Sequence, residues 1–264
     1  MTCGGTLARM SQSAVQVLAP SPGPLGRGAL PVIEAALARK IEDSTSLLRE
    51  AASQFARMVY ANSLGAEAIV LTDLICTQVP QIDIITIDTG RLPEETLSLL
   101  DRLERRYHRR IQVYYPDAAA VERYVREQGI NGFYNGLPER LACCQVRKVE
   151  PFRRAIAGYD AWITGLRREQ SETRADGAAI TRDAHGIAKV SPLLDWTEAE
   201  VWTYILSKKL PYNVLHDRGY PSIGCAPCTR AIEPGQDNRA GRWWWEQADS
   251  RECGLHPRRR PATG

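Results

Sequence analysis

The chain has 264 residues, of which 44% are hydrophobic and 25% are charged. These fractions are ordinary for a globular protein, so they exclude disordered and fibrous classes, and the length allows one large α/β domain or two small ones. The formal net charge of +3 is too small to indicate nucleic-acid binding by itself. No apolar run reaches the roughly 20 residues of a membrane helix and no signal peptide is visible, so we expect a cytoplasmic protein with reduced thiols.

We expect three parts along the chain. Residues 1–30 are rich in Ser, Pro and Gly without periodicity, which predicts a disordered lead-in. Residues 31–256 are expected to form a single domain. Residues 257–264, with three arginines, form a basic C-terminal extension.

Apolar segments typical of buried strands alternate with helical patterns through the domain. The predicted strands cover 58–61, 82–87, 111–115 and 161–165. The predicted helices cover 66–77, a segment after Pro93, 117–128, a segment from Pro138 and 198–208. A first helix is expected to be capped by Asp43 and Ser44, and 179–190 is interpreted as a hairpin or a β-arm. This alternation predicts an α/β fold with a doubly wound, mostly parallel sheet.

Small and polar residues follow the first two strands, where open α/β sheets bind ligands. The turn after the first strand contains Ser63, Gly65 and Glu67, just before a helix N-terminus whose free N–H groups suit an anion. An ordinary strand-to-helix turn is the alternative. The second strand is followed by Asp88, Thr89 and Gly90.

A third segment, after the strand at 161–165, is rich in forked hydrogen-bond donors. Its candidate anion-binding residues are Gly165, Arg167, Arg168, Gln170, Ser171 and Arg174. Guanidinium groups match the geometry of phosphate and sulfate oxygens, so we expect them to bind an anion at the same sheet edge. A solvated charged loop is the alternative.

Four of the seven cysteines have the spacing of metal or cluster ligands. Cys225 and Cys228 form a Cys-x-x-Cys pair, and Cys143 and Cys144 are adjacent on a predicted helix beside basic residues. Adjacent helical positions reach a multinuclear cluster more easily than one small ion. Two small buried residues are the alternative for the tandem pair. Cys76 is interpreted as a packed apolar residue.

Cys253 differs from these four cysteines. It lies in a polar, arginine-rich segment with a glycine beside it and His256 three residues further on. A cysteine in positive surroundings has a lowered pKa and becomes a nucleophile. We therefore interpret Cys253 as a candidate catalytic thiol on a flexible C-terminal catalytic tail.

Seven patterns occur together over residues 44–256. They are Ser63-Leu-Gly-Ala-Glu67, Asp88-Thr-Gly90, Cys143-Cys144-x-x-Arg147-Lys148, Gly165-Leu-Arg-Arg-Glu-Gln-Ser171-x-x-Arg174, Gly224-Cys-Ala-Pro-Cys228, Arg239-Ala-Gly-Arg242-Trp-Trp-Trp245 and Glu252-Cys-Gly-Leu-His256. In these patterns the chain resembles the assimilatory adenylyl-sulfate reductases of the sulfonucleotide reductase family. The resemblance implies the fold of the PP-loop adenine nucleotide hydrolases.

The resemblance also implies a reaction and its parts. A [4Fe-4S] cluster is expected on Cys143, Cys144, Cys225 and Cys228. Cys253 is expected to attack the sulfonyl sulfur of adenylyl sulfate, so that AMP leaves and a cysteine S-sulfonate remains. A thioredoxin- or glutaredoxin-type thiol then releases sulfite, for cysteine biosynthesis. The resemblance places Lys148, Arg239 and Arg242 against the sulfate and phosphate, and His256 can meet Cys253 if that segment is helical.

Three alternatives remain at this stage. The first is a reductase of the 3′-phosphorylated nucleotide, or one that accepts both nucleotides. The second is an ATP-cleaving PP-loop adenylyltransferase, which needs paired glycines and an aspartate that the turn from Ser63 to Glu67 lacks. The third is a zinc-stapled nucleic-acid-binding module, which leaves Cys253 without a role. A homo-oligomer is compatible with the sequence.

Overall fold

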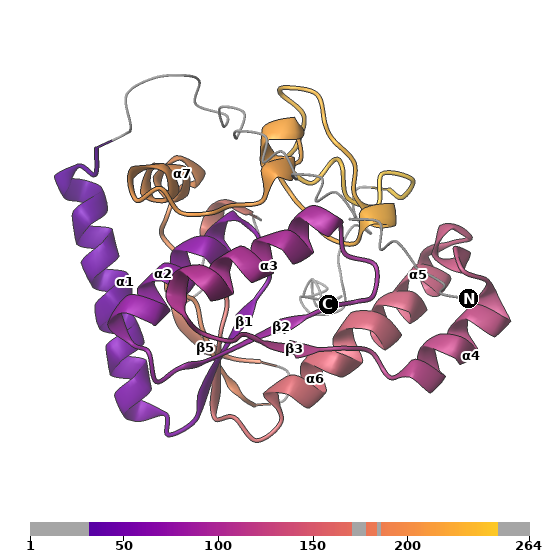
Figure 1. Cartoon of the computed structure of the whole chain (residues 1–264), viewed down its shortest axis with the longest axis horizontal. Coiled ribbons are helices and arrows are strands. Elements are labelled where there is room, and N and C mark those ends of the chain that lie inside the picture. The colour runs from indigo at the N-terminus through magenta and orange to yellow at the C-terminus, as the bar shows by residue number, and fades with distance from the viewer. Residues whose placement is uncertain (1–31, 171–177, 184–185, 248–264) are drawn as a thin grey trace, which may run out of the picture.

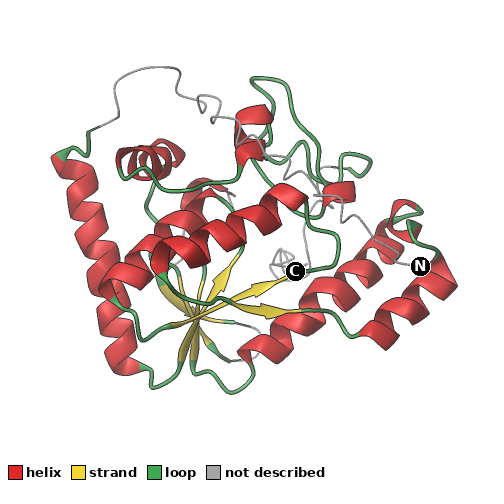
Figure 2. Ribbon diagram, viewed as in Figure 1, coloured by secondary structure: helices red, strands yellow, loops and turns green. Residues whose placement is uncertain are grey.

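A computed structural model of the chain describes residues 32–170, 178–183 and 186–247. The expected lead-in at 1–30 and the extension at 257–264 lie outside these ranges. So do Ser171, Arg174, Cys253 and His256. Within the described ranges, helices lie on both sides of one sheet (Figure 2).

The sheet has the strand order β3-β2-β1-β4-β6-β5 in the described part of the chain. The strands are β1 (Met58–Asn62), β2 (Asp83–Ile87), β3 (Gln112–Tyr114), β4 (Ala161–Ile163), β5 (Ile180–Arg182) and β6 (Ala188–Val190). Every neighbouring pair is parallel except β5 and β6, which form the predicted antiparallel hairpin. The prediction of a doubly wound, mostly parallel sheet is therefore confirmed.

The described part of the chain has helices on both faces of the sheet and beside it. They are α1 (Ala35–Gln54), α2 (Ala66–Gln78), α3 (Glu94–Tyr107), α4 (Ala118–Gln128), α5 (Leu137–Cys144), α6 (Glu150–Ile156) and α7 (Glu198–Ser207). Helices α1, α2, α3 and α7 share the largest hydrophobic core with one face, whereas α6 packs Phe152 and Ile156 on the other. Because strand side chains alternate, Tyr60 belongs to the first core and its neighbour Val59 to the second.

The predicted start of α1 is wrong. The helix begins at Ala35 rather than after a cap at Asp43 and Ser44. Leu37 packs in the core one turn before Ile41, so the apolar stripe extends toward the N-terminus. Ser44 is buried inside the helix and donates from Oγ to the carbonyl of Pro192 at 2.8 Å. A serine that pairs with another segment resembles a cap in sequence but is not one.

The chain after α7 covers the carboxyl ends of the strands. It contains short 3₁₀ turns, η5 (Val214–Arg218) and η6 (Ala226–Cys228), joined by loops. Figure 1 shows its yellow end next to α5, at the opposite end of the molecule from α1. The predicted cap of α7 is confirmed, since Thr197 accepts from the backbone N–H of Glu200. None of the described helices combines the length and apolar character needed to cross a membrane.

Candidate active site

A cavity of about 260 Å³ lies at the carboxyl ends of β1, β2 and β4. Its walls come from the turns after these strands, from α5 and the π-helical turn η2 (Gln145–Val149), and from the segment after η5. Several residues proposed from the sequence line it: Ser63, Glu67, Thr89, Cys143, Cys144, Lys148, Gly165, Gln170, Cys225, Cys228 and Arg242. Open α/β sheets bind ligands at this edge.

The turn after β1 is held by Asn62, which the sequence analysis did not identify. Its side chain accepts from the N–H of Leu64 at 2.8 Å and donates to Thr72 Oγ1 at 3.0 Å. Leu64 is in the left-handed region with φ of 59°. The N-terminus of α2 therefore faces the cavity, with Ser63 at its rim.

Glu67 and Arg167 pair with each other. Arg167, which is 4% exposed, donates from Nε to Glu67 at 2.8 Å and from Nη1 to Glu169 at 2.6 Å. Gln170 also donates to Glu67, at 3.0 Å. Arg167 and Arg168 are not among the residues that line the cavity, and Arg168 pairs with Asp195. These contacts join the loop after β4 to α2, so Arg167 supports the shape of the cavity.

Thr89 is the member of the Asp88–Gly90 segment that reaches the cavity. Its hydroxyl lies 3.2 Å from Cys225 Sγ, and its carbonyl accepts from Arg147 Nη1 at 2.9 Å. Asp88 instead accepts from the N–H of Gly90 at 2.8 Å and shapes the turn. Gly90 has φ of 68°, which favours glycine. Asp88 and Gly90 are not in the cavity wall.

The structure brings the two cysteine pairs to one cavity wall. Cys143 and Cys228 are buried, each 8% exposed, and pack in one cluster with Cys225 and Trp243. Burial raises the pKa of Cys143, which Arg147 partly offsets. Burial, with Cys225 next, raises the pKa of Cys228 to about 12. Four thiols of this kind can hold a metal cluster once they lose their protons.

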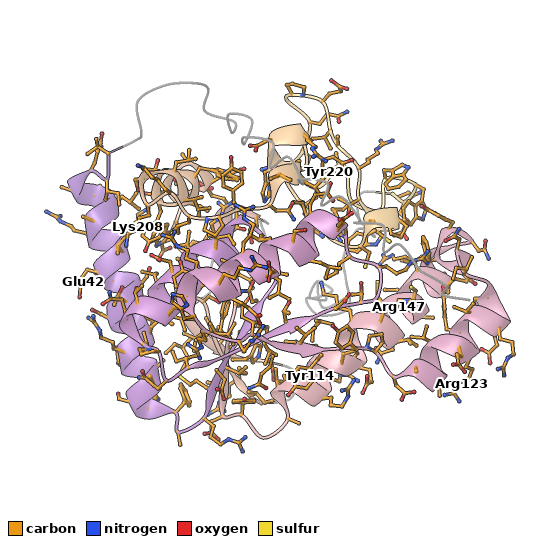
Figure 3. All side chains as sticks on the ribbon, viewed as in Figure 1. Glu42, Tyr114, Arg123, Arg147, Lys208 and Tyr220 are labelled. Carbon is orange, nitrogen blue, oxygen red and sulfur yellow. The ribbon has the colours of Figure 1, made fainter. Side chains whose placement is uncertain are left out.

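Three residues that pack with these cysteines or line the same cavity carry buried N–H groups. Within the described residues, Arg147 Nε, Trp243 Nε1 and Trp245 Nε1 are buried without a hydrogen-bond partner. Figure 3 shows Arg147 beside the strand ends. No three His, Cys, Asp or Glu side chains of the described part converge closely enough for one metal ion. These three nitrogens are donors without an acceptor in the described part of the protein, which is unfavourable unless a bound group accepts from them.

Arg242 is the arginine of the C-terminal segment that lines the cavity, together with Lys148. Its guanidinium lies 4.5 Å from the ring centroid of Trp243 and against the backbone of Gly224, where a Cβ atom would overlap it. Arg239 lies 5.8 Å from the same ring and is outside the cavity wall. Glycine at position 224 therefore leaves the space that the Arg242 side chain occupies.

Two further residues of the site were missed from the sequence. Arg140 lines the cavity with no exposed surface, and it forms an ion pair with Glu246 at 2.8 Å. Neither residue belongs to a spacing pattern, so no local signal distinguishes them from surface charges. An arginine is rarely buried, and only the folded structure shows that Arg140 is.

Comparison with known proteins agrees with this geometry. Residues 57–231 match the model of the phosphoadenosine phosphosulfate reductase domain family. The adenosine 5′-phosphosulfate reductase of Allochromatium vinosum is 52% identical over 235 residues, 89% of each chain. That of Neisseria meningitidis serogroup B is 50% identical over 225 residues, 84% of this chain and 92% of the relative.

Solved structures give the same result for the fold. Phosphoadenylyl-sulfate reductase from Candida auris, in a phosphate complex, superposes with a TM-score of 0.62 and 26% identity over 78% of this chain and all of that one. FMN adenylyltransferase from Candida glabrata has a TM-score of 0.54 at 18% identity, covering 84% of this chain and 73% of that chain, and shares the fold alone. The expected adenine nucleotide hydrolase-like fold is confirmed.

Proposed function

Because this chain belongs to the phosphoadenosine phosphosulfate reductase family, we propose that it reduces adenylyl sulfate to sulfite and AMP through a thiol of its own. The reaction class is that of its curated relatives, adenosine 5′-phosphosulfate reduction, which makes the protein an oxidoreductase. We assign it to assimilatory sulfate reduction in the cytoplasm. The observation that carries the proposal is that two cysteine pairs, Arg242 and the N-terminus of α2 share one cavity.

The cavity supports an anionic nucleotide. Ser63 and the N-terminus of α2, with Gly65 at its N-cap position, are proposed to offer N–H donors to phosphate. Lys148 and Arg242 bring positive charge to the same wall. In this proposal Asp88, Gly90 and Arg168 shape or flank the pocket, and Ser171 and Arg174 extend its anion-binding loop.

The proposed resident cofactor is a [4Fe-4S] cluster held by Cys143, Cys144, Cys225 and Cys228. The buried N–H groups of Arg147, Trp243 and Trp245 support this proposal, since cluster sulfides accept such hydrogen bonds. When bound, the cluster supplies those acceptors and a local charge beside the substrate. Thr89, at 3.2 Å from Cys225 Sγ, helps to orient one of the ligands.

The proposed nucleophile is Cys253. Its thiolate forms a bond to the sulfonyl sulfur while the bond from that sulfur to the phosphate oxygen breaks, and AMP leaves with the electron pair. Lys148, Arg239 and Arg242 are proposed to offset charge on the leaving phosphate, and His256 to assist the thiol. A thioredoxin- or glutaredoxin-type thiolate then attacks the Cys253 sulfur, releasing sulfite, and a second thiol resolves the mixed disulfide.

The test is mass spectrometry of the anaerobic protein incubated with adenylyl sulfate before any reductant is added. Wild type is expected to gain one SO₃ group on Cys253, whereas Cys253→Ser gains none and keeps its iron. Cys76→Ser is the matched control, because Cys76 packs against the scaffold core away from the cavity wall. A wild-type protein that gains no mass contradicts the proposal.

Substrate preference needs a separate measurement, because the family name and the Candida auris relative both refer to the 3′-phosphorylated nucleotide. We expect adenylyl sulfate to be consumed first when both nucleotides are present at equal concentration. Preferential consumption of the 3′-phosphorylated nucleotide would reverse this assignment.

A further inference from the structure

Arg140 and Glu246 form an ion pair that is almost completely buried. The Arg140 side chain has no exposed surface, and the Glu246 side chain is 6% exposed. Two parallel hydrogen bonds of 2.8 Å, from Nε and Nη2, join the guanidinium to both carboxylate oxygens. A cation is buried at this depth only where a partner with good geometry offsets its loss of water.

The pair connects two parts of the chain that meet at the cavity. Arg140 belongs to α5 and lies one turn before Cys143 and Cys144. Glu246 directly follows the three tryptophans at 243–245, in the C-terminal part of the sequence. The separation along the sequence is 106 residues. The ion pair is therefore a tertiary clasp between the helix of the tandem cysteines and the C-terminal segment.

Trp243 joins this clasp to the proposed anion-binding residue. The guanidinium groups of Arg140 and Arg242 lie 4.6 Å and 4.5 Å from the centroid of its ring. Cations beside one ring repel each other, and Glu246 neutralises the charge of Arg140, whereas Arg239, 5.8 Å from the same centroid, lies outside the cavity wall. Arg242 thus contributes the positive charge that faces the cavity from this pair of arginines.

The backbone between these residues is anchored at both ends. The N–H of Trp243 donates to the carbonyl of Cys228 at 3.1 Å, and the N–H of Glu246 donates to the carbonyl of Trp243 at 2.9 Å. Trp243 has φ of 44°, a conformation that a bulky residue rarely adopts without surrounding support. The bond from Arg140 to Glu246 supplies that support from α5.

Electrostatics agree with this picture. An arginine side chain keeps its charge in proteins, and the two-point bond to Glu246 offsets the cost of burying that charge. Arg140 therefore stays charged inside the protein. A charged group near Cys144 and the cavity wall is suited to hold geometry as well as to balance charge.

We propose that Arg140 and Glu246 are positioning residues that hold the turn at 243–246, and with it Arg242, against the cysteine-lined cavity. This inference rests on the proposed function and adds two residues to it. Neither side chain needs to touch the reacting atoms. Their role is to keep the anion-binding guanidinium of Arg242 in place at the cavity wall.

A double-mutant cycle tests the proposal in the full-length, iron-loaded protein. Arg140→Gln, Glu246→Gln and the double variant are compared for AMP affinity by calorimetry and for S-sulfonate formation in a single turnover without reductant. Each single variant is expected to form the adduct about 10- to 100-fold more slowly, because small misplacements have effects of that size. The double variant is expected to be no slower than the slower single variant, since the pair is already broken.

The matched control is the ion pair of Arg105 with Asp101. It has the same two-point geometry, at 3.1 Å and 3.0 Å, but its side chains are 79% and 56% exposed on α3. The corresponding cycle with Arg105→Gln and Asp101→Asn is expected to change neither AMP affinity nor adduct formation. That result would attribute the slower adduct formation to loss of a buried contact between two segments of the site, and not to loss of an ion pair as such.

Arg140→Lys separates positioning from charge. Lysine keeps the positive charge but cannot reproduce the two-point bond, so iron content is expected to be retained while adduct formation stays slow. The proposal is overturned if Arg140→Lys and Glu246→Gln react and bind AMP like wild type. It is also overturned if both singles are slow but the double variant is slower by the product of their effects.

Failure of the proposed function gives a different result. In that case wild type forms no adduct, and the pair is tested by AMP affinity and by hydrogen exchange of residues 239–247. Faster exchange and weaker AMP binding in Glu246→Gln than in Asp101→Asn support the clasp. Equal exchange and equal affinity in these two variants refute it.

Discussion

Asp73 and Glu246, two carboxylates of the described chain whose side chains have little exposed surface, lie in contrasting settings. Asp73, 4% exposed on α2, accepts from Tyr107 at 2.7 Å, from Tyr204 at 2.6 Å and from Lys208 at 3.3 Å. These partners come from α3 and from α7 and its end, so Asp73 ties three helices within the largest core. Glu246 instead lies beside a small cluster of cysteines and aromatic rings, where Trp243 and Trp245 hold buried N–H groups without partners in the described chain.

The difference separates a scaffold from a site. Around Asp73 the protein itself supplies every partner of the carboxylate. Around the cysteines, the buried N–H groups at Arg147 Nε, Trp243 Nε1 and Trp245 Nε1 have no acceptor in the described chain, and such preorganised donors distinguish a site from a core. Two buried nitrogens on the scaffold side, Arg109 Nη1 and His216 Nε2, also have no hydrogen-bond partner in the described chain. The two regions therefore differ in how many such nitrogens lie together, and not in whether any occur.

The largest expected effect breaks the site and spares the scaffold. Cys228→Ser removes a buried cysteine from the proposed cluster set, so we expect loss of bound iron and of sulfite release. The helical circular dichroism signal is expected to persist. Iron and acid-labile sulfide assays on anaerobic protein check this, with Cys76→Ser as the variant that keeps both. Full iron content in Cys228→Ser would remove Cys228 from the ligand set.

The next effect breaks the scaffold. Asp73→Ala leaves the buried hydroxyl of Tyr204 and the half-buried hydroxyl of Tyr107 without their acceptor, which is expected to lower the free energy of unfolding by about 4 kcal/mol. Denaturant unfolding measures the change. Because Asp73 is not in the cavity wall, AMP affinity at a temperature where the variant is folded is expected to match wild type. A large loss of affinity would show that the two regions are coupled.

A pH effect tests the scaffold side of the comparison through a buried histidine. His216, in η5, packs on Trp202 with centroids 5.0 Å apart, and burial lowers its pKa to about 4. The unfolded chain therefore binds the proton first as pH falls below about 6.5, so stability decreases between pH 6.5 and 4, by about 3 kcal/mol in total. His216→Phe is expected to flatten this dependence in denaturant unfolding. An unchanged slope would exclude His216 as its source.

The smallest expected effect comes from a substitution that displaces a charged side chain of the site but removes no charge. Gly224→Ala places a Cβ atom where the Arg242 guanidinium lies, so the guanidinium must move. We expect AMP affinity to fall about 10-fold, or about 1.4 kcal/mol. The same substitution in an Arg242→Ala background is expected to have no further effect. An equal loss in both backgrounds would show that Gly224 acts by another route.

The fold was largely predictable because its strands and helices are locally patterned. Short apolar runs such as 58–61 and 161–165 became β1 and β4, and the cap at Thr197 began α7. The start of α1 was not predictable from the cap signal, because Ser44 pairs with Pro192, which is 148 residues away. The residues next to a side chain in the sequence do not show that it will form a hydrogen bond with a distant carbonyl.

The candidate site was predictable in part for the same reason. Cysteine spacing and the arginine of the tryptophan run are local patterns, and the structure brings Cys143, Cys144, Cys225, Cys228 and Arg242 to one cavity. The sequence predicted anion binding for Arg167 and Arg168, which pair with carboxylates and lie outside the cavity wall. Binding by these two arginines stays a prediction.

The amino-acid sequence alone determined the alternation of strands and helices, the ligand spacing of the cysteines and the family patterns, because these depend on residues a few positions apart. Only the tertiary structure decided that Thr89 contacts Cys225, that Glu67 forms an ion pair with Arg167, and that Arg140 is buried against Glu246. Such pairs form when distant segments exclude water together, and the burial that gives them their strength is a property of the packed chain.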